Sequence, residues 1–165
     1  SKVTITGVVE DGNAQVVSDA SCSFVDRTGA TLATDECDQN GIYQLYVPTD
    51  EIGYIYCGPK DMPSLNLSTV VSTDGVAAGE TLAGENITPT TTVAADIIRS
   101  ENPTDLNARK RQLMLQAQTD ADLQLVAAIA DKTSDFNLDA HLNTSECQDL
   151  FEQQQEEDHH RLLHQ

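Results

Sequence analysis

The sequence has few aromatic side chains and no long apolar run. Aromatic residues make up 4% of its 165 residues and tryptophan is absent, so a core has to be built mainly from Val, Ile, Leu and Ala. The longest apolar stretch, 125–130, spans six residues. A membrane-spanning helix needs about 20. We therefore expect no membrane insertion.

Basic side chains are also scarce. The chain has 9 Lys and Arg against 27 Asp and Glu, a formal charge of −18. This charge would repel the phosphates of a nucleic acid, so we expect no nucleic-acid partner. It is typical of a solvated surface and could also attract a basic partner. A chain of this length can bury such a core without a metal. We predict no cofactor.

Motifs of common active sites are missing. The sequence contains no GxSxG, P-loop or GxGxxG pattern, and all four histidines lie at position 141 or later. The many Ser and Thr residues of the first half therefore have no nearby histidine to activate them as nucleophiles. We predict that the chain is not an enzyme.

Four cysteines, Cys22, Cys37, Cys57 and Cys147, are dispersed along the chain. None forms CxxC, which argues against a zinc knuckle or a thioredoxin-like site. An even number of dispersed cysteines is typical of two disulfides in an oxidising compartment, and four buried thiols are the alternative. We predict a secreted or cell-envelope protein.

Cys22 and Cys57 fall on the predicted core faces of two strands. A bond between them would close a loop of about 35 residues and stabilise the fold by about 3–4 kcal/mol on the chain-entropy model. Cys37 would then pair with Cys147. Four cysteines allow three pairings, so the sequence alone leaves the choice open. An intermolecular bridge through Cys37 or Cys147 is another alternative.

Alternating apolar and polar residues predict a series of short strands in the first half of the chain. The stretch 35–48 (DECDQNGIYQLYVP) is a turn followed by a strand that Pro48 ends. Such strands separated by turn residues indicate a β-sandwich. The predicted strands are 2–10, 20–26, 30–34, 42–48, 52–57 and 65–71.

The turn in this stretch is acidic. Glu36, Asp38, Asn40 and Gly41 resemble part of a calcium-binding loop, but Val47 stands where the closing Glu would be. We interpret it as an ordinary turn.

The second half of the chain has helical periodicity. Residues 74–87 are rich in Gly, Ala and Glu and are predicted to be a linker. Thr88 can cap a helix that begins at Pro89 and ends near 102–103. Further helices are predicted over 104–118, 120–131 and about 145–162. The expected fold class is α+β: an N-terminal antiparallel sandwich over 1–73, the linker, and three to four helices over 88–165.

The first half also resembles a known family. An I-x-G-x-V start at Ile5 is followed by Thr34-Asp35 and by Asn40-Gly41-x-Tyr43-x-Leu45-x-Val47-Pro48. This pattern resembles the signature of carboxypeptidase-regulatory-like domains, relatives of transthyretin-like and collagen-adhesin B-type modules. The resemblance implies a seven-stranded sandwich of the immunoglobulin or transthyretin type in a bacterial secreted protein. Such a domain serves as a rigid spacer or interaction module.

Three tyrosines are candidate contact residues. Tyr46, Tyr54 and Tyr56 come from two strands predicted to be neighbours and could form an exposed strip for glycan or protein contact. Ordinary cross-strand packing is the alternative.

Three histidines near the end of the chain are candidate metal ligands. His160 and His164 are four residues apart, so they would share one face of a helix, and His159 is adjacent. A solvated helix end is the alternative.

These observations lead to one main hypothesis and one alternative. The main hypothesis is a non-catalytic secreted or cell-envelope structural or interaction protein, with cell adhesion as one such role. Its partner would be another protein or itself, in an oligomer or fibre in which strand 2–10 and exposed sheet edges pair between subunits. The alternative is a soluble metal- or glycan-binding module.

Overall fold

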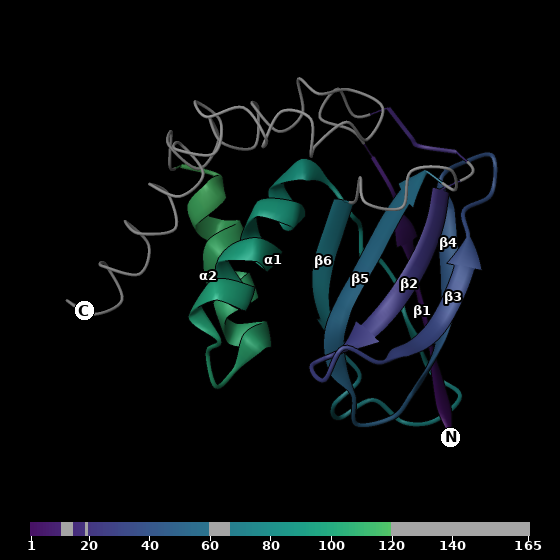
Figure 1. Ribbon diagram of the computed structural model, residues 1–165, viewed down its shortest axis with the longest axis horizontal. Helices are drawn as coiled ribbons and strands as arrows, with labels where there is room; N and C mark the ends of the chain where they lie inside the picture. The colour runs from purple at the N-terminus through teal and green to yellow at the C-terminus, as the bar shows by residue number, and fades with distance from the viewer. Residues whose placement is uncertain (11–14, 19, 60–66, 120–165) are drawn as a thin grey trace.

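A computed structural model describes residues 1–10, 15–18, 20–59 and 67–119 of the chain. This part is α+β, with seven strands followed by two helices (Figure 1). The strands are β1 (Lys2–Val8), β2 (Ala20–Asp26), β3 (Thr31–Glu36), β4 (Ile42–Pro48), β5 (Ile52–Pro59), β6 (Leu67–Ser72) and β7 (Thr81–Leu82). The helices are α1 (Pro89–Glu101) and α2 (Leu106–Ala117).

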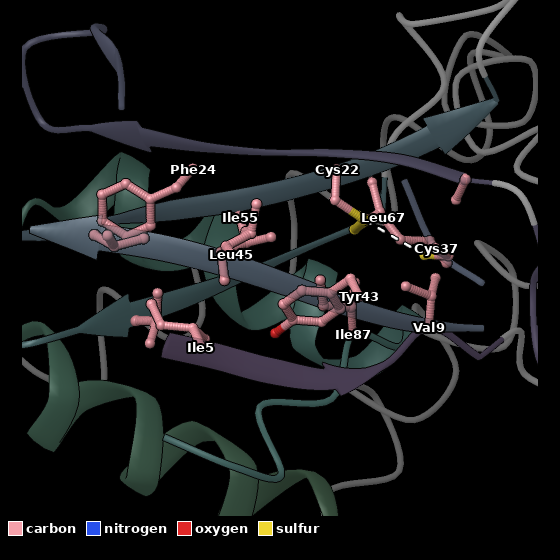
Figure 2. Packing of buried hydrophobic residues seen from close by; sticks show 14 residues of the cluster. Ile5, Val9, Cys22, Phe24, Cys37, Tyr43, Leu45, Ile55, Leu67 and Ile87 are labelled. Carbon is pink, nitrogen blue, oxygen red and sulfur yellow. Dashed lines mark hydrogen bonds between the residues drawn. A yellow bond between two sulfur atoms is a disulfide. The ribbon is translucent and has the colours of Figure 1, made fainter. Parts of the chain in front are cut away.

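Two sheets lie face to face. One has the strand order β4-β1-β7 and the other β3-β2-β5-β6. The inward side chains of both sheets meet in one core, because every second residue of a strand points to the same face (Figure 2). The core includes Ile5, Val9, Phe24, Tyr43, Leu45, Val47, Ile55, Leu67, Val71 and Ile87.

The six strands predicted from alternation are all present. β2 and β4 have the predicted bounds, and the other predicted strands differ by one or two residues at their ends. The predicted faces are also confirmed: Tyr43 and Leu45 are buried while Ile42 and Tyr46 are exposed. Alternation is reliable here because one face of each sheet is packed and the other faces outward.

The segment predicted as a linker contains β7 and follows β1 along its length. Gly79 N–H donates to Lys2 O (2.8 Å), and Ile87 N–H donates to Val8 O (2.9 Å). β4 occupies the other side of β1 from Lys2 to Val8. The hypothesis that strand 2–10 pairs with a second subunit is therefore wrong for this structure, because both of its sides are used within the chain.

The sequence predicts an antiparallel sandwich, and this prediction is wrong for β7, which runs parallel to β1. The chain leaves β6 at the end of the sandwich where β1 begins, and Thr73 N–H donates to Glu51 O (2.8 Å) there. From that end the following segment can only run alongside β1 in the same direction. The composition of segment 74–87 did not predict this strand, because Gly and Ala are poor strand formers.

Gly7 allows the backbone at Glu85 to approach β1 closely. A Cβ built at Gly7 would lie 2.2 Å from Glu85 O. The buried Tyr43 hydroxyl donates a hydrogen bond to the same carbonyl oxygen. Burial, with smaller effects of Glu85 and Cys37, raises the pKa of this hydroxyl above its usual value of 10.0, so it remains a donor.

The two helices pack on the outer face of the second sheet, beside β6 and β5 (Figure 1). Thr88 caps α1 and Pro89 occupies its first turn, as predicted, and Asn102 ends it in the left-handed conformation. Asp105 caps α2 by accepting from Ala108 N–H (3.0 Å). The predicted helices over 120–131 and 145–162 lie outside the described residues. The cluster under the helices comprises Val70, Val93, Ala94, Ala95, Ile97, Ile98, Leu106, Leu113 and Ala117.

Candidate binding surface

The Cys22–Cys57 disulfide predicted from the sequence is present. The two residues lie directly opposite each other on β2 and β5, with their Cα atoms 4.1 Å apart. Both side chains are buried in the sandwich core. The bond thus joins two neighbouring strands of one sheet.

Cys37 is buried at the same end of the core. Its Sγ lies 3.6 Å from Cys22 Sγ, and its N–H donates to Ala20 O (2.7 Å). Figure 2 shows Cys22 and Cys37 side by side, next to Leu67. Cys147 lies outside the described residues, so its predicted bond to Cys37 stays a prediction.

The acidic turn before β4 uses its carboxylates to bind backbone. Asp38 Oδ1 accepts from the N–H groups of Asn40 (2.8 Å) and Ile42 (3.0 Å), and Asp35 Oδ2 accepts from Gln44 N–H (2.9 Å). These bonds fit an ordinary turn. They also occupy N–H groups on the outer edge of β4, which would otherwise be open to another strand.

The outer edge of the second sheet, at β6, is covered by helix side chains. Thr92 Oγ1 accepts from Ser68 N–H (3.0 Å), and Thr91 Oγ1 donates to Ser68 O (2.8 Å). Lys110 Nζ donates to Val70 O (2.7 Å) and pairs with Glu85 (2.9 Å). Of the four edge strands, β4 and β6 therefore have backbone groups bound by the chain's own side chains. Strand addition, part of the self-assembly hypothesis, is disfavoured there.

The predicted tyrosine strip does not form. Tyr54 and Tyr56 lie on β5, where the Arg99 guanidinium stands 4.7 Å and 5.4 Å from their ring centroids. Arg99 also donates to the Tyr56 hydroxyl (2.9 Å), so these rings help to attach α1. Tyr46 lies on β4, in the other sheet. Alternation identified all three as outward-facing but could not show that they belong to opposite sides of the sandwich.

Burial raises the pKa of the Tyr54 hydroxyl above its usual value of 10.0. The nearby Arg99 charge lowers it, but by less. The ring is therefore neutral at physiological pH and contributes to packing.

The outer face of the first sheet is the main exposed apolar surface of the described sandwich. We call it the β4–β1 face. Tyr46 is 56% exposed and Ile42 41% exposed, whereas the described helices pack on the opposite sheet. The register places Thr4 beside Tyr46, and Val8 beside Ile42. The face thus combines apolar and hydroxyl-bearing side chains without a carboxylate, in a strongly acidic chain. Its outward residues include the cationic Lys2 together with Thr4, Thr6, Val8, Ile42, Gln44 and Tyr46.

The predicted metal ligands His159, His160 and His164 lie outside the described residues. Within the described ranges, no group of three His, Cys, Asp or Glu side chains is arranged to hold a metal ion. Neither described helix is long and apolar enough to cross a membrane.

Comparisons with known proteins were made for the whole sequence and for the structure. No protein-family model and no curated protein matches the chain. The crystal structure of S.CueP has a TM-score of 0.37 at 11% identity, over 52% of this chain and 63% of that one. A C-terminal fragment of the pilus adhesin SpaC from Lactobacillus rhamnosus GG has a TM-score of 0.28 at 17% identity, over 53% of this chain and 42% of that one. Both likenesses are partial and too low to indicate a function. The fold is a β-sandwich, and the carboxypeptidase-regulatory-like family is not established.

Proposed function

We propose that this chain is a non-catalytic structural or interaction protein that contacts a protein partner through the β4–β1 face. The observation that carries the proposal is the difference between the two outer faces of the sandwich. The chain's own helices cover one, and the other exposes Tyr46 and Ile42. Exposed aromatic and apolar side chains are typical of the centre of a protein interface.

The edges at β4 and β6 favour contact through a sheet face over addition of a partner strand. Asp35 and Asp38 bind N–H groups along the β4 edge, and helix side chains bind the β6 edge. A partner strand would have to displace these bonds, whereas the β4–β1 face needs no rearrangement. The face also lacks carboxylates, so a partner can exclude water from it without burying unpaired negative charge.

The cellular setting supports the same role. The buried Cys22–Cys57 disulfide fits a secreted or envelope location, where such bonds persist. The non-catalytic assignment rests on the missing nucleophile and base motifs of the sequence. The protein partner in this proposal includes a second copy of the chain.

Site-specific photo-cross-linking tests the proposal. A photoreactive phenylalanine analogue would replace Tyr46 in the full chain expressed in its own cells. The matched control carries the analogue at Leu115, an α2 residue that is 66% exposed. We expect defined cross-linked products, to another protein or to a second copy, from position 46 and not from position 115. Equal labelling at both positions, or none at 46, would contradict the proposal.

Sedimentation velocity separates the two kinds of partner. If the partner is a second copy, the sedimentation coefficient rises with concentration, and the double variant Y46S/I42T abolishes the rise while L115Q does not. If the partner is another protein, the purified chain stays monomeric although position 46 cross-links in cells.

A further inference from the structure

The two ends of the β4–β1 face carry opposite charges. Buried and more exposed residues alternate from Lys2 to Glu10, so both of these side chains lie on the outward side of β1 and of the two residues that follow it. They are eight residues apart, which is about 27 Å along a strand. Among the described residues, no ion pair uses either side chain. The face therefore has an ammonium group at one end and a carboxylate just past the other.

The outward side chains are placed symmetrically about the centre of the face. Tyr46 and Ile42 lie two residues on either side of Gln44 along β4. Gln44 is paired with Thr6, and the two charged side chains lie four residues on either side of Thr6 along β1. A two-fold axis through this centre, perpendicular to the strands, would thus superimpose each apolar side chain on the other apolar one and each charge on the opposite charge.

We propose that the partner of the β4–β1 face is a second copy of the chain, an inference that rests on the proposed function. The two faces pack together with their β1 strands antiparallel, about the two-fold axis through the face centre. Tyr46 of one copy then contacts Ile42 of the other, and Lys2 of one copy pairs with Glu10 of the other. Each contact occurs twice, because both copies contribute the same surface.

Charge complementarity favours this occupant. A chain of net charge −18 repels its own copy, and the two Lys2–Glu10 pairs place attraction where the copies meet. Sheets that pack face to face lie about 10 Å apart, a gap that extended Lys and Glu side chains together can bridge. A contact only a few strands wide lies at the small end of protein interfaces. We therefore expect a weak, reversible dimer whose affinity responds to these charges.

Charge reversal tests the arrangement. Sedimentation velocity would be measured over a range of concentrations at about 0.15 M salt, where repulsion is screened beyond about 8 Å. We expect K2E and E10K each to weaken self-association about three- to tenfold, and K2E/E10K to recover the wild-type affinity. L115Q, on the exposed side of α2, should leave it unchanged.

E10K separates specific pairing from general repulsion. It changes the net charge from −18 to −16, because a charge of −1 becomes +1. General repulsion alone would therefore make E10K associate more tightly than the wild type, whereas loss of the Lys2–Glu10 pairs makes it associate more weakly. Circular dichroism would show that each variant keeps the wild-type fold.

Photo-cross-linking supplies a second measurement that keeps the native charges. The chain with the photoreactive analogue at position 46 would be mixed with an isotope-labelled wild-type chain and digested after Lys, Arg and Glu. We expect the analogue to be joined to labelled peptide 37–51, which contains Ile42. Attachment to labelled peptides from α2 instead would contradict the arrangement.

Failure of this inference is distinguishable from failure of the proposed function. A purified chain that stays monomeric, while position 46 cross-links to a different protein in cells, overturns the second copy as partner and leaves the proposed function in place. A dimer that E10K does not weaken, or that K2E/E10K does not restore, overturns the antiparallel arrangement. Absence of any cross-link from position 46 overturns both.

Discussion

Two buried threonines of this sandwich show how hydrogen bonding determines the effect of a buried hydroxyl group. Thr69 and Thr73 are both fully buried. Thr73 Oγ1 donates to Pro48 O (2.8 Å) and accepts from Glu51 N–H (2.9 Å). Thr69 Oγ1 has no hydrogen-bond partner within the described residues. Hydrogen bonds therefore offset the desolvation cost of the Thr73 hydroxyl, whereas that of the Thr69 hydroxyl is not offset.

Replacing these two residues by valine should have opposite effects. We expect T69V to raise the free energy of unfolding by about 1 kcal/mol, because it removes an unpaired buried hydroxyl. We expect T73V to lower it by about 1–3 kcal/mol, because backbone groups lose their partner. Urea denaturation measures both. Destabilisation of similar size in the two variants would show that Thr69 has a partner after all.

Asp26 predicts an acid-dependent loss of stability at the turn between β2 and β3. Its Oδ1 accepts from Thr28 Oγ1 (2.6 Å), Ala30 N–H (2.9 Å) and Thr28 N–H (2.9 Å). The Thr28 hydroxyl contributes most to lowering the pKa of this carboxyl below its usual value of 3.8. A lowered pKa means that the unfolded state binds the proton first, so the stabilisation is present above about pH 4 and is lost as the pH falls below it.

Urea denaturation of the wild type and D26N between pH 2.5 and 6 would test this dependence. The difference in unfolding free energy should be constant above about pH 4 and should shrink below it. A difference that does not change over this range would exclude a role for the Asp26 charge.

At the scale of elements, the two helices are joined to each other by a buried ion pair. Arg109 of α2 and Glu101 at the end of α1 are each 6% exposed. Arg109 Nε donates to one carboxylate oxygen (2.7 Å) and Nη2 to the other (2.9 Å), and Nη1 donates to Gln112 (3.0 Å). This geometry sets the angle at which α2 returns against α1 and β6.

Two arginine substitutions on α2 distinguish the effect of this ion pair from a general effect of charge. We expect R109M to lower the free energy of unfolding by about 3–5 kcal/mol, because it leaves the buried Glu101 carboxylate unpaired. R111M changes an exposed residue two positions away and should cost less than about 0.5 kcal/mol. Thermal and urea denaturation measure both. If the two variants lose similar stability, the Arg109–Glu101 pair does not hold the helices together.

At the scale of the whole molecule, the net charge of −18 opposes compactness. Screening shortens the range of this repulsion from about 30 Å at 0.01 M salt to about 8 Å at 0.15 M. We expect the Tm at pH 7 to rise by several degrees over this interval in sodium chloride. Calorimetry would check this, with sodium perchlorate compared to separate screening from specific ion effects. A Tm that falls with salt would indicate that attractive ion pairs outweigh the repulsion.

Much of the architecture follows from the sequence alone, for reasons that are local. Alternation placed six strands and the faces of Tyr43 and Ile42 correctly, because a strand with one packed face needs a period of two. Thr88 and Pro89 marked the start of α1, because capping uses only neighbouring backbone groups. The Cys22–Cys57 bond was one of three pairings that the sequence left open.

Only the tertiary structure decided which outward face is exposed and which is covered. Tyr46 and Tyr54 have the same pattern in the sequence, yet one lies on the β4–β1 face and the other beneath α1. The sequence likewise did not predict the pairing of β7 with β1 or the contact between Cys37 and Cys22. Both depend on how segments far apart in the sequence pack together. Local periodicity specifies the secondary structure that a segment can form, whereas long-range packing specifies which other segments it contacts.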